Sequence, residues 1–135
     1  MIVRKARPED LEQVSRLAES LGLDYPGLEN DPIWVADEGG RISGIVALMK
    51  HPDSDELVAL GVDPGHRSKG LGRRLVEALL AEAPDDVYLA TIIPWFFERS
   101  GFAVIPVAPP GMVKAPAWCE GCPKEKCAIM IRKAR

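Results

Sequence analysis

The sequence lacks any apolar run approaching the roughly 20 residues that are needed to cross a bilayer. Its start, Met1-Ile-Val-Arg-Lys, becomes charged at once and has no apolar core of the kind that marks a signal peptide. These two absences predict that the chain has no membrane partner and is cytoplasmic.

The chain also lacks an excess of positive charge, with 17 Lys and Arg against 20 Asp and Glu and a net charge of −3. General nucleic-acid binding depends on a basic surface that neutralises many phosphates, so no nucleic-acid partner is expected. The cations are concentrated instead, in one cluster between positions 67 and 74 and in another formed by Arg132, Lys133 and Arg135.

Cysteine is scarce, with three residues that all lie between positions 119 and 127. The number is odd and a cytosolic chain seldom uses disulfides, which leaves metal binding or packing. The spacing of Cys119, Cys122 and Cys127 is common in zinc and iron–sulfur sites, but zinc takes four ligands. His51, His66 or a partner chain are the candidate fourth ligands for a structural zinc. The alternative is that the cysteines are small buried apolar side chains.

What the chain does have is an ordinary globular composition, with 47% hydrophobic and 27% charged residues over a length of 135. This length suits a single domain with its own core. We expect one domain over 1–135, with a core at 1–107 and a Pro- and Cys-rich segment at 108–135.

Apolar periodicity and turn residues predict the order of the elements. Helices are expected at 8–21, 71–80 and 95–100, and strands at 2–5, 33–37, 42–50, 56–62, 87–90, 102–107 and 128–132. This order describes an α/β fold with a mixed sheet and helices on its faces.

The stretch from Val62 to Arg74 is a strand end that runs through a glycine-rich, cation-rich turn into an apolar helix. Gly70 and Gly72 let the backbone approach a bulky anion closely. The N–H groups and the positive dipole end at the start of a helix favour negative charge. The turn is therefore predicted to bind a phosphate, although a plain helix start is the alternative for a bare Gly-x-Gly.

Two motifs carry a resemblance to a known family. Leu57-Val-Ala-Leu-Gly-Val-Asp-Pro64 followed by His66-Arg-Ser-Lys-Gly-Leu-Gly-Arg-Arg-Leu75 resembles the acyl-coenzyme A motif of the GNAT superfamily of N-acetyltransferases. Phe96-Phe-Glu-Arg-Ser-Gly-Phe102 resembles the second signature of that family. The resemblance covers most of positions 1–107, and it implies a mostly antiparallel sheet of six to seven strands.

The resemblance also implies the roles of the residues in the first motif. Backbone N–H groups of Arg67, Ser68, Lys69, Gly70, Leu71, Gly72 and Arg73 are expected to hold the pyrophosphate of acetyl-CoA. The strand end Leu60, Gly61 and Val62 is expected to pair with the pantetheine arm, and a backbone N–H there, which we assign to Leu60, to polarise the thioester carbonyl.

An attacking amine must be neutral, so a general base is useful. Glu56 is the leading candidate, because many members of the family use a carboxylate at the start of this strand; a solvated strand-end acid is the alternative. His51 is the second candidate, since imidazole, with an ordinary pKa of about 6.5, suits proton transfer. Phe97 departs from the family, in which a tyrosine often stands here to protonate the leaving thiolate.

The tail extends the resemblance to small proteins that are classed with amino-acid N-acetyltransferases and are linked to glutamate acetylation. A dicarboxylate acceptor needs a fixed cation, and Arg4, Arg41 and Arg99 are the candidates. The prediction is therefore acetyl transfer from acetyl-CoA to the amine of a small amino acid, in a chain that can form a homodimer. The competing class is a coenzyme- or metal-binding regulatory module without turnover.

Overall fold

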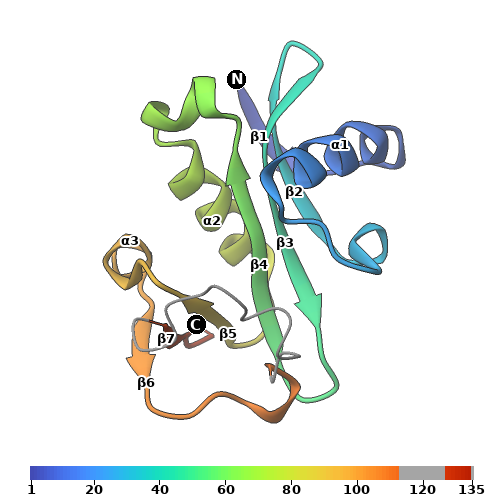
Figure 1. Ribbon diagram of the computed structural model, residues 1–135. Helices are drawn as coiled ribbons and strands as arrows, with labels where there is room; N and C mark the ends of the chain where they lie inside the picture. Colours follow the sequence, from blue (N-terminus) through green and yellow to red (C-terminus); the bar gives the residue numbers. More distant parts are fainter. Residues whose placement is uncertain (113–126, 135) are drawn as a thin grey trace. The chain divides into compact units, whose positions relative to one another are not determined.

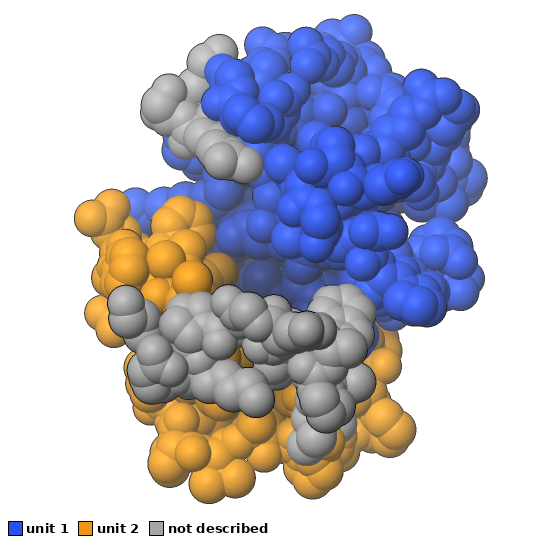
Figure 2. Space-filling model, viewed as in Figure 1, with its two compact units in different colours: residues 1–49, 57–83 blue, residues 50–56, 84–135 orange. Residues whose placement is uncertain are grey.

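The computed structural model describes residues 1–112 and 127–134, with the backbone alone at 67–69 and 111. This part of the chain divides into two compact units, 1–49 with 57–83 and 50–56 with 84–135, which Figure 2 shows in blue and orange. We describe each unit by itself, and the single domain stays a prediction. No helix in the described ranges is long and apolar enough to cross a membrane.

The elements follow the predicted order along the chain (Figure 1). The strands are β1 (Ile2–Lys5), β2 (Ile33–Glu38), β3 (Arg41–Lys50), β4 (Asp55–Val62), β5 (Val87–Thr91), β6 (Ala103–Ile105) and β7 (Ala128–Arg132). The α-helices are α1 (Leu11–Leu21), α2 (Leu71–Glu82) and α3 (Pro94–Glu98). Short 3-10 turns are η1 (Pro8–Asp10), η2 (Leu28–Asn30), η3 (Pro64–Lys69) and η4 (Pro110–Met112).

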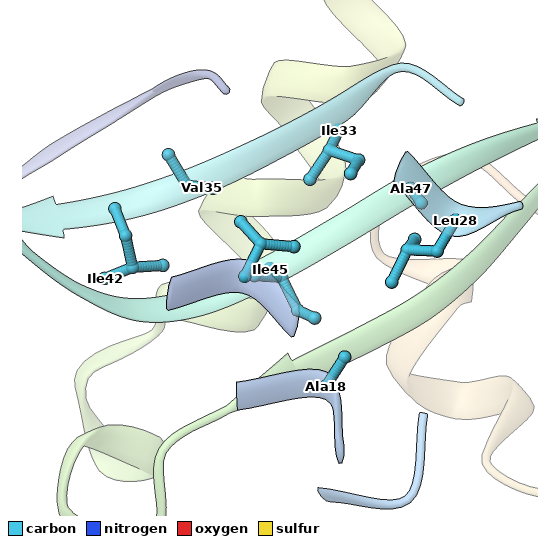
Figure 3. Packing of buried hydrophobic residues seen from close by; sticks show 8 residues of the cluster. Ala18, Leu28, Ile33, Val35, Ile42, Ile45 and Ala47 are labelled. Carbon is cyan, nitrogen blue, oxygen red and sulfur yellow. The ribbon is translucent and has the colours of Figure 1, made fainter. Parts of the chain in front are cut away.

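The first unit packs α1 and α2 against a sheet in which β2 and β3 are the most deeply buried strands. Residues Ile33 to Ala36 of β2 are all buried, as expected for a strand covered from two sides. One face packs against α1 in a cluster that Figure 3 shows: Val14, Ala18, Leu28, Ile33, Val35, Ile42, Ile45 and Ala47. The opposite face meets α2, where the Trp34 indole N–H donates to Glu82.

The second unit contains an insertion that the sequence analysis did not predict. β7, the last strand of the chain, lies between β5 and β6 and pairs antiparallel with both. The first residues of β4 pair parallel with β5, Asp55 with Val87 and Glu56 with Tyr88. The strand order is β1-β2-β3-β4-β5-β7-β6, a mixed and mostly antiparallel sheet, so the predicted fold class is confirmed.

Among the strands, the predicted and observed bounds differ most at β6. The strand was expected over 102–107, but it covers only Ala103–Ile105. Proline at 106 has no N–H to donate to a ladder, which accounts for the early end. Phe102 is instead buried beside α3, where its N–H donates to the carbonyl of Phe97 at 3.3 Å.

Candidate functional site

The end of β4 carries a backbone irregularity directly before the residues that were predicted to face the thioester. Ala59 has a φ of 54°, in the left-handed region that a residue with a Cβ rarely adopts. Such a residue within a strand bends it and turns the following peptide groups away from the regular ladder direction. Leu60 and Gly61, which come next, are half-buried, and Val62 is buried.

β4 leads through η3 into α2, the predicted anion-binding turn (Figure 1). Gly70 is the N-cap of α2, with a φ of 70° that favours glycine. The first helical bond runs from the Arg74 N–H to the Gly70 carbonyl, at 3.2 Å. The N–H groups of Leu71, Gly72 and Arg73 are therefore at the positions that lack intrahelical acceptors.

The charge at this helix start is suited to an anion. The first turn of α2 contains no acidic residue, and Arg73 and Arg74 are exposed there. The backbone of Arg67, Ser68 and Lys69 forms the end of η3, while their side chains lie outside the described part. The predicted cofactor-binding residues thus form one continuous segment, from the end of β4 to the first turn of α2.

Polar contacts hold η3 against the strands of its own unit. The Asp63 N–H donates to the Ser43 carbonyl at 2.8 Å, and the Asp63 carboxylate accepts from Arg41 at 2.7 Å. His66 Nε2 lies 2.8 Å from an oxygen of Glu38, at the end of β2. These contacts hold the turn against the β2–β3 hairpin.

The two candidate bases, which belong to the second unit, are in contact with each other. His51 Nε2 lies 2.8 Å from Glu56 Oε1. Glu56 is almost completely buried, with 1% of its surface exposed, so the alternative of a solvated strand-end acid does not apply. A carboxylate at such a place requires a hydrogen-bond donor, and His51 is placed to be one.

A cavity of about 510 Å³ borders the same histidine. Its lining is polar and consists of His51, Pro52, Asp53, Ser54, Asp55, Asp85, Asp86, Tyr88 and Ala134. Two of its acids have cationic partners, since Lys50 lies 3.0 Å from Asp55 and Lys133 lies 3.7 Å from Asp86. The imidazole of His51 thus lies between a buried carboxylate and a polar cavity.

Phe97 belongs to the core of the second unit. It is 6% exposed, and its ring makes edge-to-face contacts with Phe96 at 5.0 Å and Phe102 at 5.8 Å between centroids. The position at which many family members carry a tyrosine is therefore filled by an apolar ring that packs with its neighbours.

The candidate cations differ in their contacts. Arg4 donates to Asp10 at 2.7 Å and to Asp37 at 3.1 Å, which lowers the pKa of the Asp10 carboxyl. The pKa of Asp37 is lowered first by the Gly40 N–H and then by Arg4. Arg4 therefore ties β1 to η1 and β2, Arg41 binds Asp63, and Arg99 is exposed after α3.

The predicted metal ligands Cys119 and Cys122 lie outside the described residues. Cys127 is described, is exposed, and directly precedes β7. Within 1–112 and 127–134, no group of three or more His, Cys, Asp or Glu side chains is placed to hold a metal ion.

Sequence reasoning missed two features of the candidate site. The left-handed Ala59 carries no signal, because alanine is not a residue that marks such a conformation. The contact between His51 and Glu56 had a signal that was not used. A hairpin turn at 51–54 brings the residues on either side of it together.

The chain matches a family model and several curated proteins. Residues 29–104 match the model of the Acetyltransferase (GNAT) domain. Mycothiol acetyltransferase of Saccharopolyspora erythraea is 39% identical over 87 residues, 57% of this chain and 28% of that protein. The Beutenbergia cavernae enzyme of the same name is 34% identical over 80 residues, 58% of this chain and 25% of that protein. The chain thus matches less than a third of the length of these relatives.

Solved structures share the fold at low sequence identity. Rv2747 from Mycobacterium tuberculosis, in complex with CoA and NLQ, has a TM-score of 0.75 and 23% identity, with 100% of both chains covered. N-acetylglutamate synthase from Neisseria gonorrhoeae, complexed with coenzyme A and N-acetyl-glutamate, has a TM-score of 0.70 and 19% identity. That match covers 100% of this chain and 36% of that one. With the family model matching more than half of its residues, the chain belongs to the GNAT acetyltransferase family.

Proposed function

We propose that this chain is an N-acetyltransferase that moves an acetyl group from acetyl-CoA to the primary amine of a small amino acid. The observation that carries the proposal is the segment from β4 to α2, where Gly70 adopts a left-handed N-cap conformation. Helix N–H groups without internal acceptors follow directly, with no acid in the first turn. This is a site for a pyrophosphate in a member of an acetyl-CoA-using family.

In this proposal the backbone does most of the binding. The N–H groups of residues 67–73 hold the pyrophosphate, and the end of β4 from Leu60 to Val62 pairs with the pantetheine arm. The irregularity at Ala59 supports this role, because it removes the following peptide groups from the regular strand pattern. The Leu60 N–H then donates to the thioester carbonyl and stabilises the oxyanion as the amine attacks.

Proton transfer is assigned to Glu56, four residues before Leu60 on the same strand. Its carboxylate takes a proton from the amine, directly or through water, so that nitrogen can attack the carbonyl carbon. Phe97 has no proton to give to the sulfur. A thiol has a pKa of about 8.5, so coenzyme A can leave as the thiolate near neutral pH.

Glutamate is the acceptor that we propose first, on the basis of the fold shared with N-acetylglutamate synthase. Arg99 is the candidate cation for the acceptor carboxylates, because Arg4 and Arg41 already bind carboxylates. The acceptor of mycothiol acetyltransferases is the second candidate, since those relatives have the higher sequence identity.

Turnover separates this function from a regulatory module that binds coenzyme A without reaction. The protein is incubated with acetyl-CoA and a panel of amines that includes glutamate, glutamine, other amino acids and amino sugars, and free thiol release is measured. Release that depends on one class of amine is the expected result. Binding of acetyl-CoA in calorimetry without release on any amine favours the module.

A further inference from the structure

The contact between His51 and Glu56 indicates that the two residues have different roles in the proposed proton transfer. His51 Nε2 lies 2.8 Å from Glu56 Oε1, and the carboxylate is buried. This contact restrains rotation of the Glu56 carboxylate about its last bond, and it therefore also restrains the direction of the second oxygen. Resting on the proposed function, we infer that His51 is a positioning residue that orients the Glu56 carboxylate for proton transfer.

The tautomer follows from the same contact. Two acceptors do not approach to 2.8 Å without a shared proton, and Glu56 must be ionised, and so an acceptor only, to serve as the proposed base. His51 Nε2 therefore carries hydrogen and donates to Glu56, as the orienting hydrogen bond does in other carboxylate–imidazole pairs. The hydrogen bond from His51 stabilises the charge of the buried Glu56 carboxylate, which in the proposed function accepts a proton from the amine.

A purely structural role in the turn between β3 and β4 explains the contact less well. That turn already has two other links, the Lys50–Asp55 ion pair at 3.0 Å and the bond from the His51 N–H to the Ser54 carbonyl at 2.9 Å. The backbone bond persists whatever side chain stands at 51. The imidazole is thus not needed to close the turn, and its distinct contribution is the donor to Glu56.

Three substitutions of His51 test the role of the donor, and one of Lys50 is the control. His51→Ala removes the donor and is expected to lower kcat about 10- to 100-fold. This loss is smaller than the loss expected on removal of the general base itself. The KM for acetyl-CoA should be unchanged. His51→Gln can place an amide N–H near the Nε2 position and is expected to recover most of kcat. His51→Asn, whose amide is too short to do so, should resemble His51→Ala. Lys50→Ala, which breaks the other side-chain link of the turn, should leave kcat within about twofold of the wild type.

Coupling to Glu56 completes the experiment. If His51 acts through Glu56, the double variant His51→Ala/Glu56→Gln should be no slower than Glu56→Gln alone. Additive losses in the double variant overturn the inference. A His51→Gln variant that is as slow as His51→Asn also overturns it. If His51→Ala does not fold, the comparison of His51→Gln with His51→Asn still tests the inference. Wild-type kcat in His51→Ala overturns the inference and leaves the proposed function standing. Absence of thiol release from the wild type overturns the function itself.

Discussion

At the scale of the residue, Gly70 allows the charge at the proposed pyrophosphate site to be tested alone. Asn and Asp tolerate the left-handed conformation of Gly70 about equally and have nearly the same size. Gly70→Asp is expected to weaken acetyl-CoA binding at least tenfold more than Gly70→Asn, because a carboxylate then faces the pyrophosphate. Isothermal titration calorimetry of both variants measures the difference. Equal affinities of the two variants for acetyl-CoA would contradict the proposal that this turn binds the pyrophosphate.

The residue scale also shows how far the sequence could predict the site. The backbone conformation of Gly70 was predictable, since glycine at the N-terminus of an apolar helix indicates an unusual φ and ψ. Glu56 was predicted as the base from the family pattern, but its burial was not. Its burial depends on side-chain packing, which a single sequence does not encode locally, whereas the turn at 51–54 was a local signal for its contact with His51. The irregularity at Ala59 likewise results from tertiary packing, because alanine has no preference for a positive φ.

At the scale of the element, η3 is held by His66, which makes the shape of the turn testable. Loss of the 2.8 Å contact between His66 Nε2 and Glu38 is expected to loosen η3 and weaken acetyl-CoA binding about 2- to 12-fold. His66→Ala and Glu38→Ala should have similar effects, whereas Glu38→Gln keeps an acceptor oxygen and should bind as the wild type does. Calorimetry with acetyl-CoA measures all three. A loss of affinity in Glu38→Gln equal to that in Glu38→Ala contradicts this account.

The bounds of the elements along the chain were more predictable than the order of the strands in the sheet. Helix α1 is bounded by Pro8 before it and Gly22 after it, and the structure has Gly22 at the C-cap with a φ of 69°. The periodicity of β7 was visible too. Its insertion between β5 and β6 was not, because strand order depends on the path of a connection and not on local pattern. Pro106 explains the early end of β6, and that signal was in the sequence.

At the scale of the whole molecule, the role of the three cysteines stays a prediction. If Cys119, Cys122 and Cys127 bind a structural zinc, protein purified without added metal should contain about one zinc per chain. Elemental analysis by mass spectrometry measures this, and Cys122→Ser should lose the metal together with thermal stability. A wild-type zinc content below about a tenth of an equivalent would leave the cysteines as packing residues.

The stability of the molecule should depend on acid through the network of Arg4, Asp10 and Asp37. The lowered pKa of Asp10 means that the unfolded chain binds a proton more readily than the folded one, so the stabilisation is complete above the ordinary value of 3.8. It is lost as pH falls below that value towards the lowered pKa. Asp37 acts in the same direction, and Arg4 stays charged throughout this range.

Urea unfolding between pH 2.5 and 7 tests this prediction with Asp10→Asn. At pH 7 the variant is expected to lose about 1.5–3 kcal/mol of unfolding free energy, as for a hydrogen bond between charged groups. The difference from the wild type should shrink as pH falls below about 4 towards the lowered pKa of Asp10, because the wild-type carboxyl is then progressively protonated and approaches the neutral state of the variant. Glu12→Gln is the matched control, since its ion pair with Arg16 is 76% exposed on both sides and contributes little. A difference between wild type and Asp10→Asn that is constant with pH would assign the loss to packing and not to charge.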